Sequence, residues 1–161
     1  MNKKQERKLE PMTIKNAKLM FLNLTGNKSQ YNPIGARTFS VRLDVELGER
    51  LKDDGWNVKP LFVRDQETGQ RTKEIEGYHL PCAVRYDKFP PKIYLITESN
   101  KTLLGENEIS MIDTADIKNV DLILNASRYD STRLQGTGVK AYVKAMYVTI
   151  NEDDLMKEYG F

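Results

Sequence analysis

Seven stretches of the chain have the composition and alternation of β-strands, and this feature limits the possible folds more than any other. β-Branched and aromatic residues recur in each stretch, and polar segments with glycine or proline separate them. They are residues 13–24, 37–45, 57–64, 78–87, 92–99, 120–130 and 138–150. Seven strands in a chain of 161 residues predict one domain dominated by β-structure, built as a barrel or a sandwich.

A few short helices complete the expected domain. Residues 46–55 place Leu47 and Leu51 on one helical face and end at Gly55, a common residue just after a helix. Residues 107–117 predict a second short helix or turn, and residues 151–161 predict a short acidic C-terminal helix. Residues 1–11 are charged and lack apolar periodicity. We therefore expect a flexible basic arm, followed by a single domain over residues 12–161.

Charge is distributed unevenly along the chain, although the formal net charge is only +2. Residues 1–92 hold 18 basic and 12 acidic residues, whereas the remainder holds 7 basic and 11 acidic residues. Cys82 is the only cysteine, so no intramolecular disulfide can form, which favours a reducing cytoplasmic setting. We find neither a signal-peptide pattern nor an apolar run of membrane-spanning length, so secretion and membrane insertion are not expected.

The residues that catalysis or metal binding would need are sparse. His79 and Cys82 lie three apart, so on a strand their side chains point to opposite faces and do not form a nucleophile pair. One histidine and one cysteine do not make a zinc site, and no complete phosphate-binding loop motif is present. Asp113 and Asp116 could share a helical face, but helix caps use such residues more often than metals do. The sequence predicts no enzyme, cofactor or metal.

Lysine and arginine alternate with aromatic residues on several strands, a pattern typical of proteins that bind single-stranded nucleic acid. Residues 138–150 show it best, because Lys140, Tyr142 and Lys144 share one face and small apolar residues share the other. After Met146 the chain is apolar on both faces, which we interpret as entry into barrel closure or beneath the C-terminal helix. Other binding candidates on strands are Arg42, Lys92, Tyr94 and Arg128. The alternative is an ordinary solvated strand face, and the parity of Phe39 and Tyr86 indicates core packing.

The loop between the first two predicted strands is a second candidate binding element. It carries Lys28, Tyr31 and Arg37 around a turn bounded by glycines. A tyrosine in such a loop has little core to enter, so it could stack on a base, although ordinary loop packing would also explain it.

Six segments together resemble a family of small phage-encoded single-stranded DNA-binding proteins. They are residues 16–43, 54–61, 88–97, 118–124, 138–150 and 152–160. The most specific pieces are YNPIGAR in the first loop, DGWNVK, PPK before residue 93, and KAY at residues 140–142. The resemblance covers about residues 16–159 and implies an OB-fold-like antiparallel β-barrel. It also implies non-catalytic coating and protection of single strands during phage DNA replication or recombination. Residues 64–77 do not align with this pattern and predict an inserted hairpin of open function.

Several alternatives remain open from the sequence. The barrel could instead be a structural or adaptor module that binds a protein partner, with its basic strands merely solvated. The acidic tail could dock replication or recombination proteins, as longer tails of bacterial single-strand-binding proteins do, or it could pack on the barrel. A homodimer is plausible through sheet edges. The pattern also predicts that Tyr142→Ala weakens single-strand binding with little loss of stability.

Overall fold

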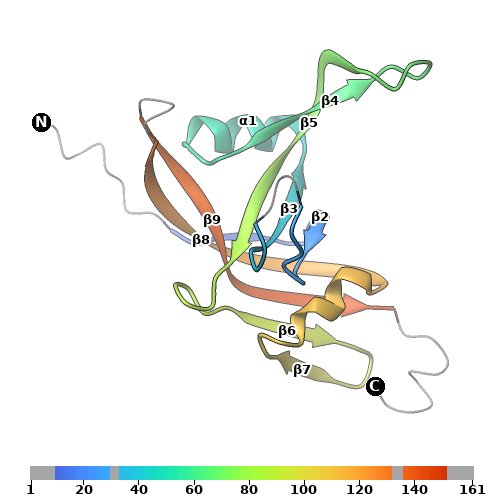
Figure 1. Ribbon diagram of the computed structural model, residues 1–161, viewed down its shortest axis with the longest axis vertical. Coiled ribbons are helices and arrows are strands. Elements are labelled where there is room, and N and C mark those ends of the chain that lie inside the picture. The colour runs from blue at the N-terminus through green and yellow to red at the C-terminus, as the bar shows by residue number, and fades with distance from the viewer. Residues whose placement is uncertain (1–9, 30–32, 132–135, 152–161) are drawn as a thin grey trace, which may run out of the picture.

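A computed structural model describes residues 10–29, 33–131 and 136–151 of the chain. Within these ranges, nine strands form one mixed sheet around a core, with one α-helix and one 3₁₀-helix (Figure 1). The strands are β1 (Met12–Ile14), β2 (Lys18–Asn23), β3 (Arg37–Leu43), β4 (Lys59–Arg64), β5 (Arg71–Val84), β6 (Lys92–Ile96), β7 (Lys101–Leu104), β8 (Ile117–Ser131) and β9 (Gly136–Ile150). The helices are α1 (Val45–Asp53) and η2 (Ile109–Thr114).

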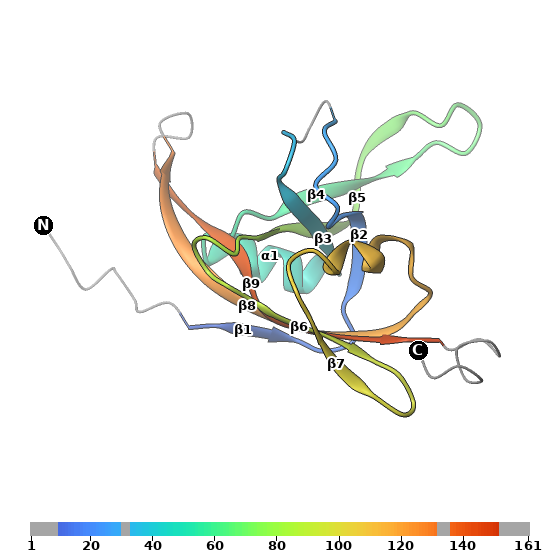
Figure 2. The ribbon, with the colours of Figure 1, turned by 60° about the horizontal axis from the view of Figure 1, so that its bottom comes forward.

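All seven predicted strand regions contain strands, so the mostly β prediction is confirmed. The first region divides into β1 and β2, because the chain turns at Lys15 and Asn16. Residues 64–77, predicted as an inserted hairpin, hold the end of β4, a turn at Gly69 and the first half of β5. This hairpin projects from the body of the molecule in two views (Figure 1, Figure 2). The sequence prediction missed β7, a strand of four residues paired along one side with β6.

The sheet is open and mixed, which differs from the closed antiparallel barrel expected from the sequence. Its main path runs β1-β8-β9-β5-β3-β2, and β9 pairs in parallel with both β5 and β6. The two ends of this path, β1 and β2, are consecutive in the chain. The backbone N–H of Ala17 donates to the Val120 carbonyl over 2.7 Å, but among the described residues no strand ladder joins β2 to β8.

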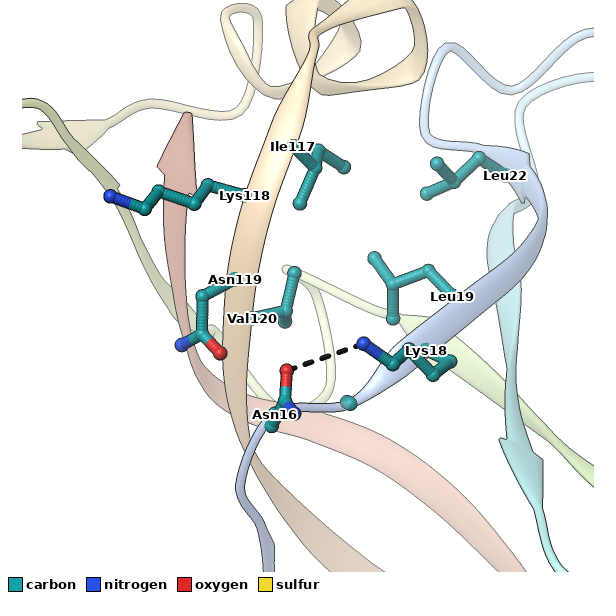
Figure 3. A pocket seen from close by; sticks show the side chains of 9 residues that line it. Asn16, Lys18, Leu19, Leu22, Ile117, Lys118, Asn119 and Val120 are labelled. Carbon is teal, nitrogen blue, oxygen red and sulfur yellow. Dashed lines mark hydrogen bonds between the residues drawn. The ribbon is translucent and has the colours of Figure 1, made fainter. Parts of the chain in front are cut away.

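Apolar side chains line the seam that this leaves between β2 and β8. Ile117 and Val120 of β8 point toward Leu19 and Leu22 of β2 across a cavity of about 230 Å³ (Figure 3). All four side chains also pack with the hydrophobic core. The sheet therefore encloses its core on this side through side-chain packing and the turn at residues 15–17, and not through strand pairing.

The helix α1 forms where the sequence predicts one. Asp44 accepts a hydrogen bond from the Leu47 amide over 2.8 Å, as a helix N-cap does, and Gly55 follows the helix with a φ of 94°. Gly48 weakens the helix pattern in the sequence, but a Cβ there would overlap the ring of Tyr78 on β5. The glycine thus lets helix and sheet approach closely. The second predicted helix is the 3₁₀-helix η2, and the predicted C-terminal helix lies outside the described residues.

Candidate nucleic-acid interface

Strand register divides the residues of β3, β5 and β9 between the core and an outward face, which is the sheet face opposite the core. Phe39, Val41 and Leu43 of β3 are buried in the core, so the residues between them point outward. Core and outward residues alternate in the same way on β5, where even-numbered residues are buried in the core, and on the first part of β9, where odd-numbered residues are. The outward residues are Thr38, Ser40 and Arg42 on β3, His79, Pro81 and Ala83 on β5, and Lys140 and Tyr142 on β9.

Four basic residues meet in one row across the outward face. Their backbones pair from β2 through β3 and β5 to β4, in the order Lys18, Arg42, His79 and Lys59. We call these four residues the basic row. With strands about 4.8 Å apart, the row is about 14 Å long and runs perpendicular to the strands. The sequence predicted only Arg42 as a binding residue, because the other three lie on separate strands and only the pairing brings them together.

The basic row is only weakly neutralised by its neighbours. Arg42 Nη1 lies 3.9 Å from Glu76 Oε1, and both side chains are more than two-fifths exposed. Lys18 Nζ donates to Asn16 Oδ1 over 3.4 Å at the edge of the seam (Figure 3). An exposed ion pair such as Arg42–Glu76 contributes little to stability, so Arg42 can exchange Glu76 for another anion at little cost.

Phe21 lies beside the basic row, in contact with His79, and is 64% exposed. Between β2 and β3 the register shifts by one residue after Met20, which makes Phe21 the extra residue of a β-bulge. Its φ is 53°, a left-handed conformation that is strained for a bulky side chain. The sequence prediction missed this residue, because residues 13–24 were interpreted as one regular strand.

The rings of Phe21 and His79 meet in a T-shaped arrangement, with the ring centroids 5.3 Å apart and the planes at 74°. His79 is half-buried, and its Nδ1 lies 2.9 Å from Ser40 Oγ, a side chain that is itself buried. Burial, and then the charge of Lys59, lower the pKa of His79 below its usual value. At neutral pH the imidazole is therefore uncharged, and its ring packs against that of Phe21.

Tyr142 lies on the predicted face of β9, but the prediction that it is exposed is wrong. Only 5% of the residue is accessible, because the ring of Phe89 covers it at a centroid distance of 4.9 Å. Lys88 Nζ and Lys140 Nζ lie over the same ring, at 5.4 Å and 5.3 Å from its centroid. The alternation of lysine and tyrosine here reflects internal cation–π packing.

A second pair of rings lies further along β9. Tyr94 and Tyr147 pair across β6 and β9 and stack with centroids 5.2 Å apart and planes at 7°. Lys101 Nζ lies 4.6 Å and 5.2 Å from the two ring centroids. We call the rings of Phe89, Tyr94, Tyr142 and Tyr147, together with Lys88, Lys101 and Lys140, the tyrosine cluster.

A β-bulge explains why the alternation of β9 breaks after Lys144. Ile123 and Leu124 of β8 pair with Ala145 and Val143, so Lys144 is an extra residue. The outward face therefore passes from even-numbered to odd-numbered residues, which places Tyr147 outward and Met146 in the core. One of our two sequence interpretations, that the strand enters barrel closure there, is wrong, because this part of β9 pairs with β8 and β6 in an open sheet. The other, that it runs beneath the C-terminal helix, concerns a helix outside the described residues.

The remaining predicted binding residues are scattered. Lys92 and Lys144 are exposed near the tyrosine cluster, and Lys28 is exposed in the loop after β2. Arg128 is exposed too, but it pairs with Val139 and so lies on the face opposite Lys140. Tyr31 lies outside the described residues.

Arg37 lies on the core-side parity of β3 and is held by a carboxylate. Its Nη1 is 2.7 Å from Glu106 Oε2, beside a hollow of about 430 Å³. Arg85, on the same hollow, makes two hydrogen bonds to Asp87, which lowers the pKa of that carboxyl group. Both guanidinium groups are thus paired with acids at 2.7–2.8 Å, closer than the 3.9 Å between Arg42 of the basic row and Glu76.

The residues considered for catalysis and metal binding have structural partners. Asp113 accepts hydrogen bonds from the Leu24 amide and from the amide and hydroxyl of Thr25, at 2.7–2.9 Å, and so ties η2 to the end of β2. Cys82 is buried in the core on the face opposite His79, and burial raises the pKa of its thiol. Within the described ranges, no three His, Cys, Asp or Glu side chains gather as a metal site would require. Nor does that part of the chain contain a helix long and apolar enough to cross a membrane.

Solved structures of two phage proteins are similar to this chain at very low sequence identity. The single-stranded DNA-binding protein from bacteriophage Enc34 in complex with ssDNA matches with a TM-score of 0.52 and 8% identity, over 89% of this chain and 88% of that chain. A C-terminal truncation of the Enc34 protein gives 0.51 and 8%, over 89% and 87%. Gp2.5, a single-stranded DNA-binding protein encoded by bacteriophage T7, gives 0.44 and 9%, over 94% of each chain. The Enc34 matches confirm the expected OB-like fold, here with an open sheet.

Comparison by sequence gives a family but no individual relative. No curated protein sequence matches the chain. The model of one family, described as "Putative phage ssDNA-binding domain", matches residues 1–160, which is nearly the whole chain. This agrees with the resemblance found in the strand and loop motifs. The chain belongs to this family of phage ssDNA-binding domains.

Proposed function

We propose that this protein binds single-stranded DNA without reading its sequence, on the outward face that carries the basic row. The observation that carries the proposal is the row itself, in which four strands bring Lys18, Arg42, His79 and Lys59 into register. Three of these side chains are exposed cations, and only one has a carboxylate within 4.0 Å among the described residues. A line of cations of this kind follows a phosphodiester backbone.

The chemistry of the face suits a backbone more than a particular base. Lysine and arginine neutralise phosphates and release counterions, which gives affinity without sequence preference. Beside the row lie the small, half-buried side chains of Thr38 and Pro81, and the DNA is proposed to pass over them between the row and the tyrosine cluster. Lys92, Lys140 and Lys144 are proposed to extend the phosphate contacts toward that cluster.

Binding of this type would protect single strands during phage DNA replication or recombination, in the cytoplasm of the host cell. It needs no chemical step, so we assign the protein no catalytic residue and no cofactor. A sheet face that only neutralises phosphates and stacks bases is sufficient to coat a single strand.

A titration with fluorescent oligo-dT and with a duplex of the same length tests the function. Binding to the single strand is expected to be tighter than binding to the duplex, and the logarithm of the binding constant should fall linearly with the logarithm of the salt concentration. Equal affinity for the two DNAs, or no binding to either, would contradict the proposed function and favour an adaptor module that binds protein.

Two finer parts of the proposal concern partners. The acidic segment that follows Asn151 is proposed to dock replication or recombination proteins, and sheet edges such as β7 are proposed to support a homodimer. Deletion of the last three residues with a pull-down tests the first part, and light scattering of the intact chain tests the second. A deletion that lowers stability and leaves every partner bound would show that the tail only packs on the domain.

A further inference from the structure

We infer that Phe21 is a base-stacking residue, held open to solvent by the β-bulge of β2. The inference rests on the proposed single-strand binding and specifies where one base lies. No pattern in the sequence selected this residue, because a single phenylalanine inside an apolar strand is ordinarily core.

Backbone geometry keeps the ring of Phe21 out of the core. The neighbouring Leu19 and Leu22 both pack with the core, but the extra residue in the bulge turns Phe21 to the other side of the sheet. A left-handed φ of 53° on a bulky residue is energetically unfavourable, and a fold retains such strain where the surroundings enforce it. Exposure of 64% for a phenylalanine adds a second unfavourable term.

Much of the Phe21 ring is open to solvent, since 64% of the residue is exposed. His79 meets Phe21 at 74°, so one of the two rings presents its edge to the other and they do not stack in parallel. In the tyrosine cluster, by contrast, Tyr94 lies nearly parallel to Tyr147 with Lys101 over both rings. Among the aromatic rings of the outward face, Phe21 is therefore the one whose surface is available for stacking on a base.

The position of Phe21 relative to the cations fits a nucleotide as the occupant. Lys18 and Arg42 belong to the same two strands, and the Phe21 ring packs on His79 within the basic row. A phosphate on the row would place the adjoining base near Phe21. An apolar partner protein would not need this line of cations, whereas a single strand uses both cation and ring.

The experiment compares Phe21→Ala, Phe21→Leu and Phe21→Tyr with the intact protein on oligo-dT. It also uses the same oligonucleotide with abasic sites in place of the bases. Phe21→Ala and Phe21→Leu should weaken binding to oligo-dT by roughly 5-fold to 100-fold, the usual range for one base–aromatic stack, while Phe21→Tyr should retain binding. On the abasic strand, which has no base to stack, all four proteins should bind within about 2-fold of one another.

Met111→Ala provides the matched control, because Met111 is also a large exposed apolar residue, at 49%, and lies in η2. It should bind oligo-dT as the intact protein does. Leucine keeps most of the apolar volume of Phe21. If Phe21→Ala is unstable, the Phe21→Leu protein should still be folded and can be compared with the intact protein. The inference fails if Phe21→Leu binds oligo-dT like the intact protein, or if the loss is equal on the abasic strand. In either case an intact protein that prefers oligo-dT to duplex still supports the proposed function.

Discussion

The two ends of the outward face contain the same residue types in opposite arrangements. At the end formed by β2, β3, β5 and β4, the cations lie in a row and the aromatic ring of Phe21 is exposed. At the end formed by β9, β6 and β7, the rings pack on one another and lysine ammonium groups lie over them. The first arrangement leaves charge and ring surface for a ligand, whereas the second uses both to stabilise the domain.

This difference shows that a lysine and tyrosine alternation is ambiguous in a sequence. In β9 it predicts a binding strand, yet Tyr142 is covered by Phe89, which comes from a distant loop. The basic row leaves no alternation to detect, because each of its members lies on a different strand. We therefore expect DNA affinity to depend mainly on the basic row and stability to depend mainly on the tyrosine cluster.

The largest expected effect is the loss of affinity when the basic row is neutralised. The triple substitution Lys18→Ala, Arg42→Ala and Lys59→Ala should weaken oligo-dT binding on the order of 100-fold at low salt, because three phosphate contacts are removed. The salt slope should also become shallower by about 2, since each contact on a single strand contributes about 0.7. Fluorescence titration at four salt concentrations measures both quantities.

A second triple substitution separates position from net charge. The triple substitution Lys92→Ala, Lys140→Ala and Lys144→Ala also removes three positive charges, here near the tyrosine cluster. We expect its affinity for oligo-dT to fall by less than about 10-fold. Equal losses in the two triple variants would mean that binding follows overall charge, and the contrast between the two ends would then be wrong.

Tyr142→Ala should reduce stability more than affinity. Removal of a ring that is only 5% exposed leaves a cavity beside Phe89, and the free energy of unfolding should fall by about 3 kcal/mol. Tyr142→Phe, which keeps the ring, should change it by less than about 1 kcal/mol. Urea unfolding measures both variants. A fully stable Tyr142→Ala protein with weakened DNA binding would restore the interpretation suggested by the sequence alone.

The pH dependence of His79 gives the smallest effect. Because folding lowers its pKa below 6.5, the unfolded chain binds the proton more tightly. The stabilising contribution of the neutral ring is therefore complete above pH 6.5 and declines as the pH falls through that value toward the folded pKa. His79→Gln should reduce the slope of unfolding free energy against pH in this range. The change in slope should correspond to less than one bound proton.

DNA binding should respond to pH in the opposite direction. A phosphate on the basic row favours the charged imidazole, so affinity for oligo-dT should increase as the pH falls from 7.5 to 5.5. The His79→Gln protein should not show this increase. An identical pH response in the two proteins would place the phosphates away from His79.

Local signals in the sequence were sufficient for much of the fold. Alternation located the strand regions, and Leu47, Leu51 and Gly55 located the helix α1. The first half of β5 carries no apolar alternation because both of its faces are largely exposed, and β7 has only four residues. Neither feature produces a periodic signal that distinguishes it from a polar loop.

The candidate site was less predictable, because it depends on register and on two bulges. One extra residue at Phe21 turns an apolar side chain to solvent, and another at Lys144 changes which residues of β9 face outward. A shift of one residue moves a side chain to the other face of a sheet, and sequence alternation alone does not place such shifts.

Ultraviolet crosslinking of the intact protein to oligo-dT, with the attached residues identified by mass spectrometry, tests the central claim most directly. Crosslinks at Phe21 and in the segment around His79 are predicted, because thymine bases would lie beside the basic row. Crosslinks confined to Phe89, Tyr94, Tyr142 and Tyr147 would contradict the account, because DNA would then bind at the tyrosine cluster.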